Sequence, residues 1–134
     1  MKVIIAGSRN YVPKTTTEFE SYIQRCSMSL GGQGFEISEV VCGMCPGVDL
    51  FARAWGFYNK IPVKEFPADW KTHGKKAGAI RNIEMAKYAD ALILIWDGKS
   101  KGSDLMRSIA KLHNLIIREL IYTNEEEHST TEQS

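Results

Sequence analysis

The sequence predicts an α/β domain in which helices cover both faces of a mostly parallel five-stranded sheet. Short apolar segments alternate with amphipathic segments of helical period, the order typical of βαβ proteins. The strand-like segments are apolar throughout, as in sheets that are buried on both faces. Three of them, VIIA, VVC and ALILIW, end in a glycine-rich polar turn that leads toward a helix.

The first half of the chain is expected to form three strands and two helices. The strands are predicted over residues 2–6, 37–42 and 63–66. A helix is predicted over residues 15–30 and ends at a glycine-rich segment, because apolar residues recur there at intervals of three and four: Phe19, Tyr22, Ile23, Cys26 and Leu30. A second helix is predicted over about residues 47–58.

The second half repeats the alternation after a loop at residues 67–74. Helices are expected over residues 75–88 and 103–113, and strands over residues 91–96 and 115–121. Residues 1–122 would form one domain. Residues 123–134 are acidic, rich in serine and threonine and without apolar side chains, so we expect them to be disordered.

Right-handed crossovers between parallel strands give the strand order 3-2-1-4-5 and a Rossmann-like three-layer domain. In such sheets ligands bind at the carboxyl ends of the strands, where the strand order reverses. The turns at Gly7 and Asp97 would flank that crevice, with the turn at Gly43 beside them. The repeated junction predicts a site for a phosphorylated small molecule.

Composition excludes several classes of protein. The net charge of +1 argues against nucleic acid or an acidic membrane as a partner, and no apolar run of 18 residues predicts a membrane span. Three cysteines are too few for a disulfide framework, which favours a reducing cytoplasm. Cys42 and Cys45 are interpreted as small strand-end and turn residues, with a redox pair as the alternative. No metal site or cofactor is expected.

Two common phosphate-binding motifs are absent. There is no G-x-G-x-x-G, and the second strand ends in a cysteine where an acidic ribose ligand would stand. Gly98-Lys99-Ser100 has the end of a phosphate loop, but Ile93 stands where that loop requires its first glycine.

The first two turns supply candidate ligand contacts. Gly7 would let the backbone approach a ligand, and Ser8 offers a hydroxyl and an amide. The planar guanidinium of Arg9 could bind a phosphate through two parallel hydrogen bonds. Each has a plainer interpretation, as a tight turn or a solvated charge. The second turn leads into a helix N-terminus that favours an anion; its candidates are Gly43, Gly47, Val48 and Asp49. Asp49 would face ribose hydroxyls, or would only complement the helix dipole.

The third turn is also interpreted as an anion site. Its candidates are Asp97, Gly98, Ser100, Gly102 and Ser103. Ser100 and Ser103 can donate to phosphate, and Ser103 is also a suitable helix N-cap. The segment at residues 69–76 mixes a tryptophan with cations, and Trp70 would either cover a base or pack on the edge of the domain.

These segments together resemble the SLOG superfamily of Rossmann-like nucleotide-binding domains, in its small YspA- and cpYpsA-related branch. The resemblance covers residues 2–120 and rests on IIAGSR at residues 4–9, PGVD at 46–49, ADW at 68–70, R-N-x-x-M at 81–85 and WDG at 96–98. It implies a ligand role for Arg81 and Asn82, which would otherwise be ordinary helix residues. Relatives include phosphoribohydrolases, DprA/Smf proteins and sensors of nucleotide-derived signals.

The resemblance leaves binding and catalysis both open. Phosphoribohydrolases carry a glutamate after the fourth strand, where this chain has Leu105 and Met106. This favours a module that binds a nucleotide or an ADP-ribose-type metabolite and senses or sequesters it. The alternative is a hydrolase that uses Asp49, Asp97 or Asp104, and single-stranded DNA binding is the third hypothesis. A homodimer or larger homo-oligomer is expected.

Overall fold

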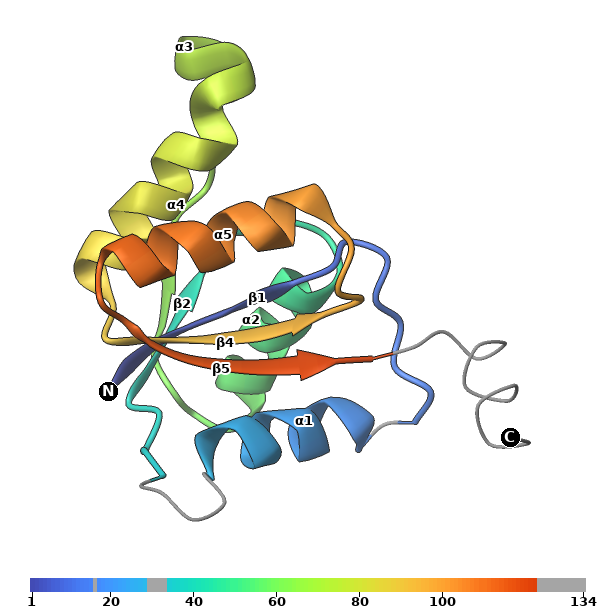
Figure 1. Ribbon diagram of the computed structural model, residues 1–134. Coiled ribbons are helices and arrows are strands. Elements are labelled where there is room, and N and C mark those ends of the chain that lie inside the picture. Colours follow the sequence, from blue (N-terminus) through green and yellow to red (C-terminus); the bar gives the residue numbers. More distant parts are fainter. Residues whose placement is uncertain (16, 29–33, 123–134) are drawn as a thin grey trace.

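The computed structural model describes residues 1–15, 17–28 and 34–122 and shows a five-stranded sheet in the order β3-β2-β1-β4-β5 (Figure 1). The strands are β1 (Lys2–Gly7), β2 (Glu39–Cys42), β3 (Val63–Glu65), β4 (Ala91–Trp96) and β5 (Ile116–Ile121). Every neighbouring pair is parallel. The predicted α/β class and strand order are confirmed.

The two central strands fix the position of the site. β1 and β4 pair from Val3 opposite Ala91 to Gly7 opposite Ile95, so both end at the same edge of the sheet. All six residues of β4 are buried, because helices cover both faces. This burial explains the uninterrupted apolar run ALILIW.

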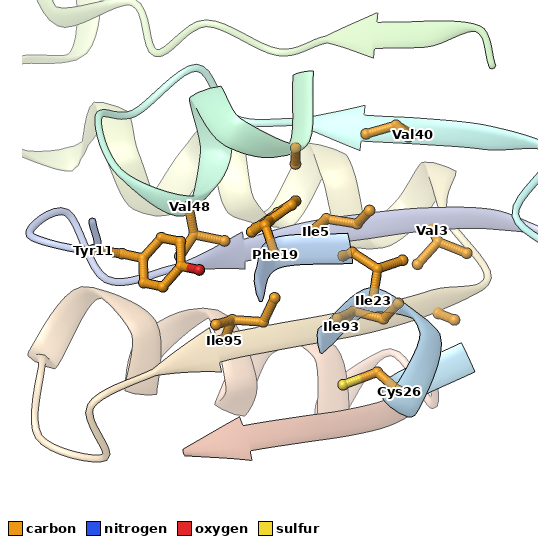
Figure 2. Packing of buried hydrophobic residues seen from close by; sticks show 12 residues of the cluster. Val3, Ile5, Tyr11, Phe19, Ile23, Cys26, Val40, Val48, Ile93 and Ile95 are labelled. Atoms are coloured by element: carbon orange, nitrogen blue, oxygen red, sulfur yellow. The ribbon is translucent and has the colours of Figure 1, made fainter. Parts of the chain in front are cut away.

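Alternate strand residues build two separate cores. Helices α1 (Glu18–Ser27) and α2 (Val48–Tyr58) cover one face, where Ile5 and Ile93 pack with Phe19 and Val48 (Figure 2). Helices α4 (Ala77–Tyr88) and α5 (Lys101–Leu112) cover the other face, over a core that includes Leu94 and Met85 (Figure 1).

Three local predictions need correction. The first helix begins only at Glu18, because Thr17 is its N-cap, and it ends at Ser27, where Met28 is extended. The loop expected at 67–74 contains helix α3 (Trp70–His73), because the Asp69 carboxylate caps it by accepting a hydrogen bond from the Thr72 amide at 3.2 Å. A 3-10 turn (Gly74–Lys76) then leads into α4.

The last helix starts earlier than expected, at Lys101, and its N-cap is Ser100 rather than Ser103. Ser103 therefore lies in the first helical turn. The tail predicted to be disordered, residues 123–134, lies outside the described residues. No helix in the described part of the chain is long and apolar enough to cross a membrane.

Candidate ligand-binding site

A cavity of about 420 Å³ opens at the carboxyl edge of the sheet, between the β1 turn and the N-terminal parts of α4 and α5. It lies at the predicted reversal of strand order. Ten of the fourteen candidate residues line it: Gly7, Ser8, Arg9, Asp49, Arg81, Asn82, Asp97, Ser100, Gly102 and Ser103. Four do not, namely Gly43, Gly47, Val48 and Gly98.

The β1 turn joins the two central strands at the cavity floor. A Cβ atom at Gly7 would lie 1.7 Å from the Ile95 carbonyl oxygen, so only glycine permits this approach. The Ser8 amide donates to the Ile95 carbonyl at 3.2 Å, and the Ser8 hydroxyl accepts from the Asp97 amide at 3.1 Å. Ser8 is therefore a buried link between two of the glycine-rich turns.

The second turn, at residues 43–49, packs against the β1 turn, and most of its candidate residues do not line the cavity. Gly47 has a φ of +80°, and a Cβ atom there would lie 2.2 Å from the Ser8 carbonyl oxygen. The Val48 amide donates to that same carbonyl at 3.2 Å. This amide of the α2 N-terminus is thus already bonded to the protein, and the Val48 side chain is fully buried in the core.

Two buried charged groups form one wall of the cavity. The Asp49 carboxylate accepts a hydrogen bond from the Cys45 amide at 3.3 Å. Arg81 donates to the Gly43 carbonyl oxygen, and its Nε donates to Asn82 Oδ1 at 2.8 Å. A Cβ atom at Gly43 would lie 2.9 Å from Asp49 Oδ2 and 3.0 Å from Arg81 Nη1, so glycine leaves the space in which these groups meet.

Asp49 is costly to keep ionised at this position. Burial raises its pKa from 3.8 to about 6, although the Cys45 amide and the Arg81 guanidinium favour the charged form. Arg81 also directs its donors to the neutral acceptors named above. The carboxylate therefore keeps acceptor capacity on a wall of the cavity, where a ligand donor would stabilise its charge.

The third turn is ordered by its own aspartate. Asp97 Oδ1 accepts hydrogen bonds from the amides of Lys99 and Ser100, each at 2.9 Å. Partial burial raises the pKa of Asp97, but these hydrogen bonds outweigh it, and the net shift is downward. Gly98 has a φ of +80° and sits against Ile121 outside the cavity. Asp97 is thus an ionised group that holds the turn.

The N-terminus of α5 presents unpaired donors to the cavity. The first amides of a helix have no partner within it, and their dipole favours an anion. A Cβ atom at Gly102 would meet nothing within 4 Å, which shows open space beside this backbone. The Ser103 side chain is 6% exposed and lines the cavity. Ser100 also lines the cavity, and its hydroxyl oxygen is buried without a hydrogen-bond partner among the described residues.

Comparisons with known proteins identify the family of this chain. A model of the YspA, cpYpsA-related SLOG family matches residues 1–73. The chain belongs to this family. It is also similar to the Gene 61 protein of Mycobacterium phage D29, with 34% identity over 109 residues, which cover 76% of this chain and 82% of the relative. No solved structure matches it. SLOG membership points to a nucleotide-related function.

Several residues of the SLOG cavity were not predicted. They are Ala6, Asn10, Cys45, Lys75, Gly78, Ala79, Met85, Leu105 and Met106. Gly78 stands one helical turn before Arg81 and Lys75 one turn earlier still, so helical spacing back from Arg81 would have indicated both. Cys45 shares its turn with Gly43, and its thiol lies 3.5 Å from Arg81 Nη2.

The hydrolase alternative named three aspartates, and two of them, Asp49 and Asp97, line the cavity. Leu105 and Met106, in place of the hydrolase glutamate, both line it. Asp104 is exposed and does not line it. In the part of the chain that the structure describes, no group of three or more histidine, cysteine or acidic residues is arranged to hold a metal ion.

Proposed function

We propose that the protein binds a nucleotide or a nucleotide-derived molecule of the ADP-ribose type in this cavity, and that it senses or sequesters the ligand. One observation carries the proposal. The cavity combines a helix N-terminus that attracts anions, where the Ser100 and Ser103 side chains line it, with the buried acceptor Asp49 on another wall. A phosphorylated sugar offers both an anion and hydroxyl donors.

The two charged regions orient the ligand. A phosphate at Gly102 and Ser103 would accept hydrogen bonds from backbone amides and the Ser103 hydroxyl, and Arg9 at the rim adds positive charge. The same phosphate beside Asp49 would be repelled. Asp49 therefore takes the sugar hydroxyls, which donate to its carboxylate.

The base would be held by apolar side chains. Met85 and Met106 are 1% and 3% exposed and line the cavity from α4 and α5. Methionine adapts its shape and packs favourably on aromatic rings. The contact that these two side chains provide does not depend on the hydrogen-bonding edge of the base, so we infer that the cavity tolerates more than one base.

Isothermal titration calorimetry with mononucleotides, dinucleotides and ADP-ribose tests the proposal. We expect one class to bind, and Ser103→Ala to weaken its binding by about tenfold or more, since a hydrogen bond to a charged group contributes roughly 1.5–3 kcal/mol. Ser108→Ala, an exposed serine on the same helix, is the control and should bind as the wild type does. The proposal fails if no nucleotide binds or if both variants behave alike.

A second candidate, hydrolysis of an N-glycosidic bond, is favoured by one observation. A buried carboxyl group whose pKa is raised to about 6 suits general acid–base chemistry near neutral pH. Asp97 is engaged by two amides and Asp104 lies outside the cavity, which leaves Asp49 for this role. Chromatography of nucleotides incubated with wild type and Asp49→Asn would show release of free base by the wild type alone.

We also infer that the chain works as a homo-oligomer in the cytoplasm. Its cysteines are free thiols, as in a reducing compartment. Leu50, Phe57 and Tyr58 leave apolar surface exposed on α2, and a second copy would cover such a surface. Light scattering after size-exclusion chromatography should give at least twice the mass of the chain, and a monomer mass would contradict this inference.

A further inference from the structure

Residues 69–76, which we call the arm, project away from the sheet. The arm consists of Asp69, helix α3 and the 3-10 turn, and in Figure 1 α3 lies at the far end of the extended α4, well beyond the strands. Every one of its side chains is exposed. The Trp70 ring lies against α4, 3.7 Å from the point where a Cβ atom of Gly78 would stand. The arm therefore contributes little to the core.

The arm carries a net positive charge, with Asp69 as its one acidic residue. It holds Lys71, Lys75 and Lys76, and no acidic residue occurs between positions 70 and 83. Within the described part of the chain none of these lysines forms an ion pair. The net charge of +1 for the whole chain is lower than that of residues 1–122, because four of the 16 acidic residues fall in residues 123–134. Residues 1–122 thus carry 17 basic and 12 acidic side chains, a net charge of +5.

The arm also presents a large aromatic surface to solvent. Trp70 is 53% exposed, whereas Trp96 is 6% exposed. Its sequence neighbour Lys71 is exposed on the same short helix, and Lys76 follows in the next turn. An exposed aromatic ring among cations is typical of a surface that binds single-stranded nucleic acid. The bases stack on the ring, and the phosphates bind the cations. An acidic peptide would use the charges but leave the indole face without a flat partner.

We propose that the arm binds single-stranded nucleic acid, with Trp70 stacked on a base and Lys71 and Lys76 at flanking phosphates. This goes against the expectation from overall charge, because the relevant cations gather on one projecting element. The surface lies outside the nucleotide cavity except for Lys75, which lines both. The proposal does not require the cavity to be occupied.

Fluorescence anisotropy with labelled 12-residue oligothymidylate and oligouridylate tests the proposal on the full chain. Binding should weaken with salt, and Lys71→Gln/Lys76→Gln should reduce the slope of log K against log salt by about 1.4, from roughly 0.7 per phosphate contact. Lys87→Gln/Lys111→Gln removes the same charge from exposed positions on α4 and α5 and should leave the slope unchanged. Trp70→Ala should weaken binding roughly tenfold.

Other outcomes would overturn the proposal. No binding at low salt, an equal loss in the two double variants, or no effect of Trp70→Ala would each contradict it. Displacement of the oligonucleotide by an equal charge of polyglutamate would assign the arm to an acidic protein instead. Ser103→Ala should not affect oligonucleotide binding, so failure here is distinguishable from failure of the nucleotide cavity. Circular dichroism of Trp70→Ala checks that the fold persists.

Discussion

Replacing Asp49 by asparagine tests the electrostatics of the cavity, because it keeps the shape of the side chain and removes its charge. Burial raises the pKa of Asp49 from 3.8 to about 6, so the folded protein releases this proton at higher pH than the unfolded chain does. Between these values the folded state binds more protons, and its stability falls as the pH rises. Each pKa unit corresponds to about 1.4 kcal/mol, so above pH 6 the ionised carboxylate costs the fold about 3 kcal/mol.

We therefore expect Asp49→Asn to be more stable than the wild type at pH 7.5 by about 3 kcal/mol, and the difference to approach zero near pH 4. Urea unfolding followed by circular dichroism at both pH values measures it. Glu84→Gln, at an exposed position on α4, is the control for loss of one negative charge. A wild type more stable than Asp49→Asn at pH 7.5, or a difference independent of pH, would refute the reasoning.

Three further predictions follow from packing and exposure. Gly43→Ala should abolish ligand binding in calorimetry, because its Cβ atom would lie 2.9 Å from the Asp49 carboxylate. Gly102→Ala has open space beside it, so its melting temperature in thermal unfolding should equal that of the wild type. Ile93→Ala, at a fully buried position of β4, should lower the free energy of unfolding by about 2–5 kcal/mol in urea titrations, and a loss below 1 kcal/mol would argue against the two-sided core. Iodoacetamide should alkylate Cys45 ahead of the buried Cys26 and Cys42, and bound ligand should protect it; mass spectrometry that finds equal labelling of all three would contradict the site.

The strands were predictable because each is a short, uninterrupted apolar run, and two-sided burial requires that pattern. The run ALILIW indicated a strand buried on both faces, and the strand order followed from handedness. The cavity-lining turns at Ser8 and Ser103 were predictable because the carboxyl ends of parallel strands share one edge of the sheet.

Tertiary contacts decided what local sequence could not. Gly47 and Val48 have the pattern of an anion-binding helix start, but the Ser8 carbonyl already accepts the Val48 amide. The start of α5 was misplaced because Ser100 and Ser103 are both suitable N-caps, and Asp97 selects the earlier one by bonding the Ser100 amide. The role of Cys45 depends on its contact with Arg81, 36 positions away.

Native mass spectrometry in the presence of single nucleotides tests most directly whether the cavity holds such a ligand. We predict one nucleotide adduct per chain, retained by Ser108→Ala and weakened by Ser103→Ala. An unliganded mass with every nucleotide tested, or an adduct that survives unchanged in both Ser103→Ala and Gly43→Ala, would contradict the assignment of this cavity.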